Sequence, residues 1–261
     1  MSRPPITPSK VFGQHFLVDE NILRVIDRLA ELDDRDVVLE VGPGLGVLTA
    51  FMAERVALVH ALEIDRALEP HLADRLSAKE NVRLLFGDAL RADLAALDPP
   101  PTKLVSNLPY NIATPLVVES LDGLPTVERW CVMVQREVAD RFFAEPGTKA
   151  YGAVSVLVRL ATERTGFHPV SRAVFRPRPR VDSALVSFRR RPLPRDYAHV
   201  KRVVEAAFSH RRKVLPNSLE LAGLASREQA AEALSALDRR PSTRAEDLSP
   251  EEFVALAEAL R

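Results

Sequence analysis

The order of the apolar runs along the chain constrains its fold more than any other feature. Short runs rich in Val, Leu and Ile alternate with segments of helical character. The runs cover residues 37–41, 57–64, 82–86, 103–106 and 127–134, and helical segments cover residues 46–54, 66–76 and the stretch that begins at residue 135. Strands that alternate with helices in this way predict a parallel, doubly wound α/β sheet.

The pattern changes near residue 190. Residues 183–189 form a late strand that no helix of a further βα repeat follows. Two prolines in the segment 191–194 interrupt regular structure, and residues 197–261 have the composition of helices only. We therefore expect two domains, a Rossmann-like α/β domain over residues 1–190 and a small, all-helical C-terminal domain over residues 191–261.

Composition excludes several classes of protein. The chain has 261 residues, of which 46% are hydrophobic and 28% charged, as in ordinary globular proteins. No segment approaches the roughly 20 apolar residues of a membrane span, and residues 1–10 are polar and unlike a secretory signal. Cys131 is the only cysteine, so no intramolecular disulfide can form. We expect a cytoplasmic, monomeric protein with no membrane partner.

The charges are distributed unevenly, although their sum is zero. Residues 159–213 contain 15 basic and 4 acidic residues, whereas residues 1–158 contain 16 basic and 23 acidic residues. Most of the basic residues in the first block are arginines, which pair with phosphate through two hydrogen bonds and stack on bases. A solvated arginine-rich surface is the alternative, but such a block favours a nucleic acid as partner.

A glycine-rich loop follows the first apolar run. Gly42, Gly44 and Gly46 give it the form Gly-x-Gly-x-Gly, and glycines there let the chain turn tightly and let a ligand approach closely. A nicotinamide dinucleotide favours Gly-x-Gly-x-x-Gly with its pyrophosphate at the helix N-terminus, and Pro43 removes one backbone donor for that group. S-adenosylmethionine has no pyrophosphate, so the loop fits this cofactor better.

Polar residues end three successive strands. They are Glu63, Asp88 and Asn107, and ligands of open α/β sheets bind at such carboxyl ends. Glu63 can accept hydrogen bonds from both ribose hydroxyls, and Asp88 can accept one from an adenine amino group. Helix capping is the alternative role for these acids, but Asp65 is better placed to cap the helix that begins at Arg66. We interpret Glu63 and Asp88 as ligand contacts.

The tetrapeptide Asn107-Leu108-Pro109-Tyr110 has the groups needed to hold an amino group on a planar base. The Asn107 side-chain carbonyl and the Leu108 backbone carbonyl can accept its two hydrogens. Pro109 fixes its own φ and lacks a competing N–H, and Tyr110 offers a ring for stacking. Taken alone, a strand followed by a proline-containing turn explains the same residues. The glycine loop and the polar strand ends favour the site.

At this point the chain closely resembles the KsgA/RsmA family of ribosomal RNA adenine dimethyltransferases, from about residue 12 to about residue 248. The resemblance rests on the order and spacing of the segments Gly13–Leu17, Gly42–Gly46, Glu63–Asp65, Asp88, Asn107–Pro115, Gln135–Val138, Lys149–Gly152, Phe175–Ser183, Arg211–Lys213 and Asn217–Leu219. It implies a class I S-adenosylmethionine-dependent methyltransferase fold. It also implies cofactor contacts at His15, Leu17, Gly42, Gly44, Glu63, Asp88 and Asn107.

The resemblance further implies a reaction and a substrate. The enzyme would dimethylate N6 of two adjacent adenosines in the 3′-terminal hairpin of 16S rRNA, on the immature 30S subunit, and act in subunit biogenesis. Tyr110 and Phe175 would sandwich the flipped base, with core packing as the alternative for Phe175. The candidates for phosphate contacts are Arg176, Arg178, Arg180, Arg211, Arg212 and Lys213. The six histidines show no metal-ligand spacing, so no metal is expected.

Three alternatives stay open. A related enzyme dimethylates large-subunit rRNA and confers macrolide resistance, and it shares the fold and cofactor site. Val181-Asp182-Ser183 and residues 211–219 favour the small-subunit enzyme. A non-catalytic RNA-binding assembly factor could keep the fold, although an intact Asn107–Tyr110 argues against that role. A nicotinamide dehydrogenase is the third alternative, but this chain lacks the spacing of the third glycine that such an enzyme favours.

Overall fold

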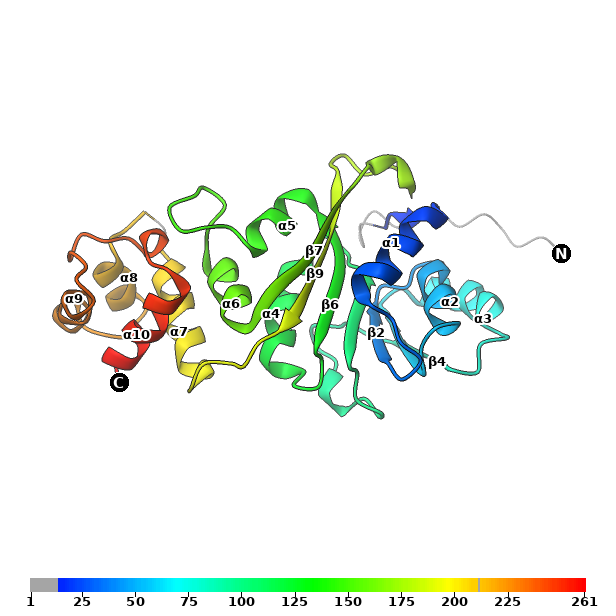
Figure 1. Ribbon diagram of the computed structural model, residues 1–261, viewed down its shortest axis with the longest axis horizontal. Helices are drawn as coiled ribbons and strands as arrows, with labels where there is room; N and C mark the ends of the chain where they lie inside the picture. The colour runs from blue at the N-terminus through cyan, green and yellow to red at the C-terminus, as the bar shows by residue number, and fades with distance from the viewer. Residues whose placement is uncertain (1–13, 211) are drawn as a thin grey trace. The chain divides into compact units, whose positions relative to one another are not determined.

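A central sheet of seven strands organises the computed structural model, which describes residues 14–210 and 212–261. The strand order is β4-β3-β2-β5-β6-β9-β7 (Figure 1). The strands are β2 (Val37–Val41), β3 (Leu58–Glu63), β4 (Val82–Phe86), β5 (Lys103–Asn107), β6 (Arg129–Gln135), β7 (Thr162–Val170) and β9 (Ser183–Arg190). β2 to β6 pair in parallel, so the α/β architecture expected from the apolar runs is confirmed.

The late strand β9 is antiparallel to its neighbour β6. Ser183 lies opposite Gln135 and Arg189 lies opposite Arg129. The expectation of a wholly parallel sheet is therefore wrong at this strand. A parallel strand would need a crossover connection, usually a helix, before it, and β9 instead follows a loop. The alternation of strands and helices stops where this connection changes.

Helices cover both faces of the sheet, because successive side chains of a strand point to opposite faces. The helices concerned are α1 (Glu20–Ala30), α2 (Val47–Ala53), α3 (Glu69–Arg75) and α4 (Ala113–Gly123). From β6, Cys131 and Met133 join one core cluster with residues of α1 and α2. On the other face Trp130 donates a 2.8 Å hydrogen bond to Ser120 of α4. Figure 1 shows α1 crossing in front of the strands.

A second, small sheet lies near the N-terminus of the described chain. It consists of β1 (Phe16–Leu17) and β8 (Phe175–Arg176), which pair antiparallel with Phe16 opposite Arg176 and Leu17 opposite Phe175. The Val18 N–H extends the ladder by donating to the Val174 carbonyl at 3.0 Å. Two residues are too few for a periodic signal, and the sequence predicted neither strand. The pairing places the N-terminal segment beside the Pro- and Arg-rich segment.

The described residues form two compact units. The first contains residues 14–139 and 164–189, and the second contains residues 140–163 and 190–261. The second unit is built from α6 (Ala153–Ala161), α7 (Tyr197–Phe208), α8 (Leu215–Leu221), α9 (Arg227–Ala236) and α10 (Pro250–Ala259); α5 (Arg136–Phe142) spans the division at residue 139.

Residues 140–163 belong to the helical unit, although the sequence placed them in the domain of residues 1–190. The reason is a long-range contact that periodicity cannot show. Tyr151 is fully buried and donates a 2.8 Å hydrogen bond to the carbonyl of Leu248. Its ring also lies edge-on to that of Phe208, with 6.0 Å between the centroids. The chain passes between the two units more than once, and the change of composition near residue 190 marks only one of these passages.

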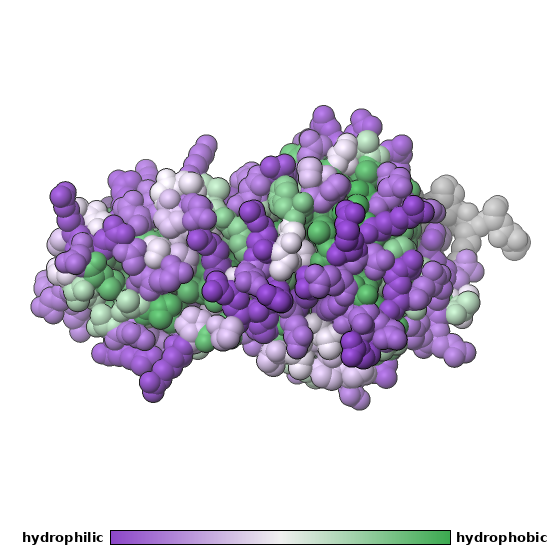
Figure 2. Space-filling model, in the orientation of Figure 1, coloured by the Kyte–Doolittle hydropathy of each residue, from purple (hydrophilic) through white to green (hydrophobic). Residues whose placement is uncertain are grey.

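Hydrophilic side chains cover most of the face drawn in Figure 2. Large apolar side chains pack in the cores of the two units, where Trp130, Phe142 and Phe253 are among the largest that are fully buried. Within residues 14–210 and 212–261, every helix is too short or too polar to cross a membrane.

Candidate active site

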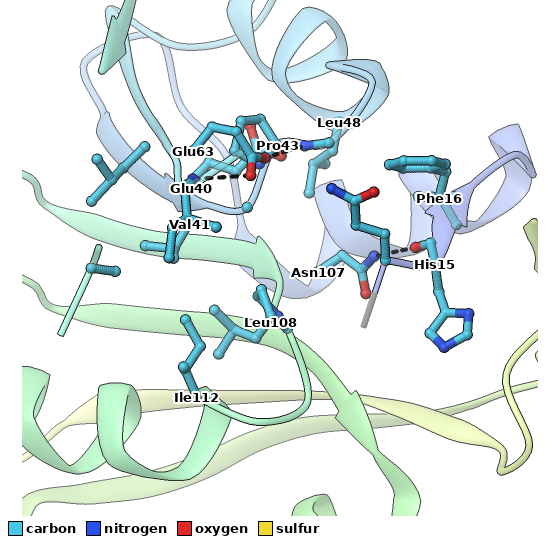
Figure 3. Close-up of a pocket in the computed structure, with 18 of the residues that line it drawn as sticks. His15, Phe16, Glu40, Val41, Pro43, Leu48, Glu63, Asn107, Leu108 and Ile112 are labelled. Carbon is cyan, nitrogen blue, oxygen red and sulfur yellow. Dashed lines mark hydrogen bonds between the residues drawn. The ribbon is translucent and has the colours of Figure 1, made fainter. Parts of the chain in front are cut away.

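A cavity lies at the carboxyl ends of β2, β3, β4 and β5, and its volume is about 1020 Å³ when the space at its open mouth is included. Residues predicted from the sequence line it together: His15, Leu17, Gly42, Gly44, Glu63, Asp88, Asn107, Leu108, Pro109 and Tyr110. The strand ends bring these residues into one place although the chain separates them widely (Figure 3). All the residues proposed as cofactor contacts thus lie around a single hollow.

The glycine loop forms the tightest wall of this cavity. Gly42 and Gly44 have φ angles of +76° and +59°, which L side chains rarely adopt. A Cβ on Gly42 would lie 3.1 Å from the Pro109 ring, and one on Gly44 would lie 3.0 Å from the Phe16 ring. The absence of side chains lets the glycine loop contact both the Asn107–Tyr110 segment and β1.

Glu63 is the acid at the end of β3, and it is only 4% exposed. Its Oε2 accepts the Gly44 N–H at 3.1 Å, and its Oε1 accepts the N–H groups of Ile64 and Asp65 at 3.0 Å each. Burial raises the pKa of Glu63, and these three backbone bonds oppose the increase. A carboxylate held this way keeps a fixed direction, and its further lone pairs can accept hydroxyl donors from a ligand.

Glu40, which the sequence analysis did not single out as a site residue, is a second acid on the cavity wall. It is 1% exposed and accepts a 2.6 Å hydrogen bond from the Thr49 hydroxyl. Burial raises the pKa of Glu40 to about 8, and the nearby Glu63 carboxylate adds to the increase. The signal available in the sequence was an acid inside an otherwise apolar buried strand.

Replacing Glu40 by glutamine should stabilise the protein at alkaline pH. The folded state favours the neutral acid, so the Glu40 contribution to stability is full below the ordinary pKa of 4.5 and declines as the pH rises to about 8. Glutamine keeps an acceptor for Thr49 but does not ionise. Across this range the difference in unfolding free energy between variant and wild type should grow by about 5 kcal/mol. Thermal melting of both proteins at several pH values measures it, and parallel profiles would contradict the buried acid.

Asp88 combines both roles considered for it. It lines the cavity, while its Oδ1 accepts the Leu90 N–H at 3.0 Å and its Oδ2 lies 3.5 Å from Arg91 Nε. The acid therefore stabilises its own turn as well as bordering the cavity. Asp65 accepts the Ala67 N–H at 3.0 Å and caps the short helix that follows, as predicted.

Several apolar residues of the wall were not among the predicted site residues, and Ile64 and Phe16 are two of them. Ile64 directly follows Glu63 and is 45% exposed, an unusual state for a large apolar side chain next to a strand end. Phe16 lies against Gly44 at the cavity. Apolar surface beside a fixed carboxylate suits a ligand with a flat ring joined to a sugar, which is the nucleoside part of S-adenosylmethionine.

The Asn107 side chain is oriented by a hydrogen bond. Asn107 ends β5, and its Nδ2 donates to the His15 carbonyl at 3.3 Å (Figure 3). The amide nitrogen is thereby occupied and Oδ1 is left to accept. The Leu108 N–H continues the ladder by donating to the Met133 carbonyl at 3.0 Å. Among the described residues, none donates to Asn107 Oδ1 or to the Leu108 carbonyl.

Tyr110 follows on the same segment. Its hydroxyl forms a 2.7 Å hydrogen bond with the Ser183 hydroxyl, and burial raises the pKa of the phenol. The ring lies beside the imidazole of His15, with 5.7 Å between the centroids and 33° between the planes. Tyr110 is therefore fixed at both the ring and the hydroxyl and stays neutral at physiological pH.

Phe175 is not part of the cavity wall. It is fully buried, and it packs in the core cluster with Leu17, Ile22 and Met133. This burial favours the core-packing alternative, and stacking of Phe175 on the target base stays a prediction that its position does not support. The cause is the pairing of β1 with β8, which turns Phe175 toward the core, a contact that the sequence does not reveal.

The candidate phosphate contacts lie in both units. Arg176, Arg178 and Arg180 are exposed in the first unit, and Arg212 and Lys213 are exposed in the second. Arg211 lies outside the described residues. Arg178 makes no hydrogen bond or ion pair with any described residue, so its guanidinium is available to a ligand. Within the described chain no cluster of three or more His, Cys, Asp or Glu side chains could hold a metal ion.

Comparisons with known proteins place this arrangement in a class. The chain superimposes on the crystal structure of a dimethyladenosine transferase from Plasmodium falciparum with a TM-score of 0.78 at 24% identity, covering 93% of this chain and 96% of that one. It matches the crystal structure of the 23S rRNA methyltransferase ErmE with a TM-score of 0.67 at 30% identity, covering 94% and 99%. The sheet and cavity therefore define a class I S-adenosylmethionine-dependent methyltransferase fold.

The sequence comparisons then narrow the class to one family. The model of the family "Ribosomal RNA adenine dimethylase" matches residues 7–261. Ribosomal RNA small subunit methyltransferase A of Rubrobacter xylanophilus is 54% identical over 250 residues, which cover 95% of this chain and 94% of that protein. The protein of that name from Streptococcus pneumoniae is 44% identical over 275 residues, covering 100% and 94%. The chain belongs to the ribosomal RNA adenine dimethylase family.

Proposed function

We propose that this enzyme transfers methyl groups from S-adenosylmethionine to N6 of two adjacent adenosines in the 3′-terminal hairpin of 16S rRNA, on the immature small subunit. The observation that carries the proposal is the orientation of Asn107. Its amide nitrogen donates to the His15 carbonyl, so its oxygen is left to accept a hydrogen bond, as is the carbonyl of Leu108. Two acceptors side by side match the two hydrogens of an adenine amino group.

The chain's own groups account for the chemistry. S-adenosylmethionine, when bound, supplies an electrophilic methyl group. Asn107 and Leu108 hold the amino hydrogens and so keep the nitrogen lone pair directed at that methyl group. Tyr110 supports the ring of the flipped base by stacking, which is worth about 1–3 kcal/mol. Once methylated, the nitrogen loses its proton to water, and no general base is required. Catalysis is mainly proximity and alignment.

The residues around the cavity fit this methyl donor. Glu63 can accept the ribose hydroxyls, Asp88 can accept the adenine amino group, and Ile64 offers apolar surface to the adenine ring. Gly42 and Gly44 leave space for the methionine part because they lack side chains. Leu17 and the His15 backbone close the opposite wall.

The small subunit is preferred to the large subunit as substrate because of the relatives. The two relatives that are 54% and 44% identical are named as small-subunit methyltransferases, whereas identity to the 23S rRNA methyltransferase is 30%. A role in subunit biogenesis follows if the enzyme meets its hairpin before assembly is complete. A purely non-catalytic assembly factor would not need the oriented Asn107.

One experiment tests the proposal. The protein is incubated with labelled S-adenosylmethionine and undermethylated small or large subunits, and dimethyladenosine is mapped by mass spectrometry. Two adjacent dimethylated adenosines near the 3′ end of 16S rRNA are expected. Label on the large subunit would overturn the choice of substrate, and binding to small subunits without label would favour the assembly factor.

Reversing the charges of Arg176, Arg178 and Arg180 to glutamate should weaken binding to the small subunit. Fewer counterions are released on binding when a phosphate contact is lost. The slope of log K against log salt concentration should therefore become less steep by about 2 to 3. Filter binding at several salt concentrations measures the slope.

A matched control reverses Arg24, Arg28 and Arg35, which are also exposed. This triple variant changes the net charge by the same amount and should keep the wild-type slope. Equal losses in the two variants would show that net charge, and not the 176–180 segment, governs binding.

A further inference from the structure

His15 connects the two sides of the cavity through different parts of the residue. Its backbone carbonyl accepts the Asn107 side chain at 3.3 Å. Its imidazole Nδ1 lies 2.8 Å from the carbonyl of Pro177. Because a carbonyl only accepts, Nδ1 must carry the hydrogen of this bond. One residue thus contacts both Asn107 and the Arg176–Arg180 segment.

The imidazole ring lies on the Tyr110 side of the cavity. In Figure 3 it points away from the carboxylates of Glu40 and Glu63. Its neighbour is the Tyr110 ring, at 5.7 Å between centroids. The side chain lies between Tyr110 and Pro177, and it makes no hydrogen bond to the acids or the glycine loop. The side chain thus lies away from the two acids on the cavity wall.

Pro177, which His15 contacts, belongs to the segment Arg176–Arg180, called here the arginine-rich arm. Phe175 and Arg176 are paired to β1 by backbone hydrogen bonds, but the pairing ends there. The bond to Pro177 is the next contact along the arm, followed by the exposed Arg178. Phe175 is buried in the core cluster, and the ring found beside Tyr110 is that of His15.

We propose that His15 is a positioning residue for the RNA substrate: through Tyr110 and Pro177 its imidazole fixes the base-stacking ring relative to the arginine-rich arm, and its side chain does not hold the cofactor. The proposal rests on the proposed function for its substrate. The two parts of the residue have separate roles: the backbone carbonyl orients Asn107, and the imidazole orients the groups that contact the RNA.

Three variants separate the contributions of the side chain. His15→Ala removes both the ring and the donor. His15→Asn keeps a donor near the position of Nδ1 but loses the ring, and His15→Phe keeps a ring beside Tyr110 but loses the donor to Pro177. Two quantities are measured for each: the dissociation constant of S-adenosylhomocysteine by calorimetry, and kcat and KM for undermethylated small subunits.

We expect His15→Ala to lower kcat/KM for the subunit about 10-fold, the combined effect of one hydrogen bond and one ring contact. His15→Asn and His15→Phe should each recover part of this loss, the former mainly in KM and the latter mainly in kcat. The dissociation constant of S-adenosylhomocysteine should stay within about twofold of wild type in all three.

Two results would overturn the proposal. A loss of affinity for S-adenosylhomocysteine that parallels the loss of activity would make the side chain a cofactor contact. Wild-type kinetics in His15→Ala would leave it without a role. A variant that does not fold is recognised by its melting temperature, and the other two then carry the test. Failure of the proposed function is distinct, because it would appear as wild-type protein that does not methylate small subunits.

Discussion

Replacement of Asn107 by alanine is expected to lower the rate of methyl transfer about 100- to 1000-fold and to leave small-subunit affinity within about twofold. The magnitude is that of removing one preorganised polar group from a reacting centre. Asn107 Oδ1 is the acceptor that its bond to His15 leaves free. Affinity for the subunit depends on many phosphate contacts that this change does not touch. Single-turnover methylation and filter binding measure the two quantities.

The neighbouring Asn111 provides a matched control. It is exposed at the same cavity, four residues further along the chain, and Asn111→Ala should retain activity within about threefold. Asn107→Asp refines the test, because aspartate keeps an acceptor but cannot donate to the His15 carbonyl, so partial activity is expected. An Asn107→Ala enzyme with wild-type rates would refute the mechanism.

Replacement of Glu63 by glutamine should raise the dissociation constant of S-adenosylhomocysteine about 100-fold. Hydrogen bonds to a charged acceptor contribute about 1.5–3 kcal/mol, and about 1.4 kcal/mol corresponds to a factor of 10. Glutamine presents an N–H₂ group to one of the backbone donors that now bind the carboxylate, those of Gly44, Ile64 and Asp65. The variant therefore loses both the charge and the fixed direction of the acceptor.

Asp65→Asn is the control for Glu63, since Asp65 is two residues away and caps a helix turn outside the cavity wall. Its effect on cofactor affinity should stay below about threefold. Calorimetric titration of both variants decides the matter. Normal binding by Glu63→Gln together with weak binding by Asp65→Asn would show that the ribose is bound by Asp65 and not by Glu63.

The sequence predicted the strands well where a short apolar run is buried on both faces. Residues 37–41, which are all buried, were predicted with the bounds of β2, because such runs leave few other structures open. Residues 82–86 were also predicted with the bounds of β4, although that edge strand is only partly buried. Helix α1 was missed although its signal is present. Ile22, Leu23, Ile26 and Ala30 are buried at helical spacing and Asp19 caps the first turn.

The site was predictable in its composition and not in its details. Glu63, Asp88 and Asn107 could be placed together because parallel strands end at one edge of a sheet. The burial of Phe175 and the direction of the His15 ring could not, since both depend on the pairing of β1 with β8 across more than 150 residues. The polar strand ends follow from local rules, whereas the substrate side depends on long-range pairing.

A Cβ added at Gly42 would lie only 3.1 Å from the Pro109 ring, and this closeness has a consequence for altering the enzyme. Under the proposed function, the Gly42–Gly46 loop borders the methyl donor and the Asn107–Tyr110 loop holds the acceptor base. These two loops pack against each other, so the distance that a methyl group crosses is set by van der Waals contact and not by a mobile loop. A larger acceptor cannot be accommodated by adjusting one loop alone. Any redesign of substrate choice therefore has to change the two loops as a pair.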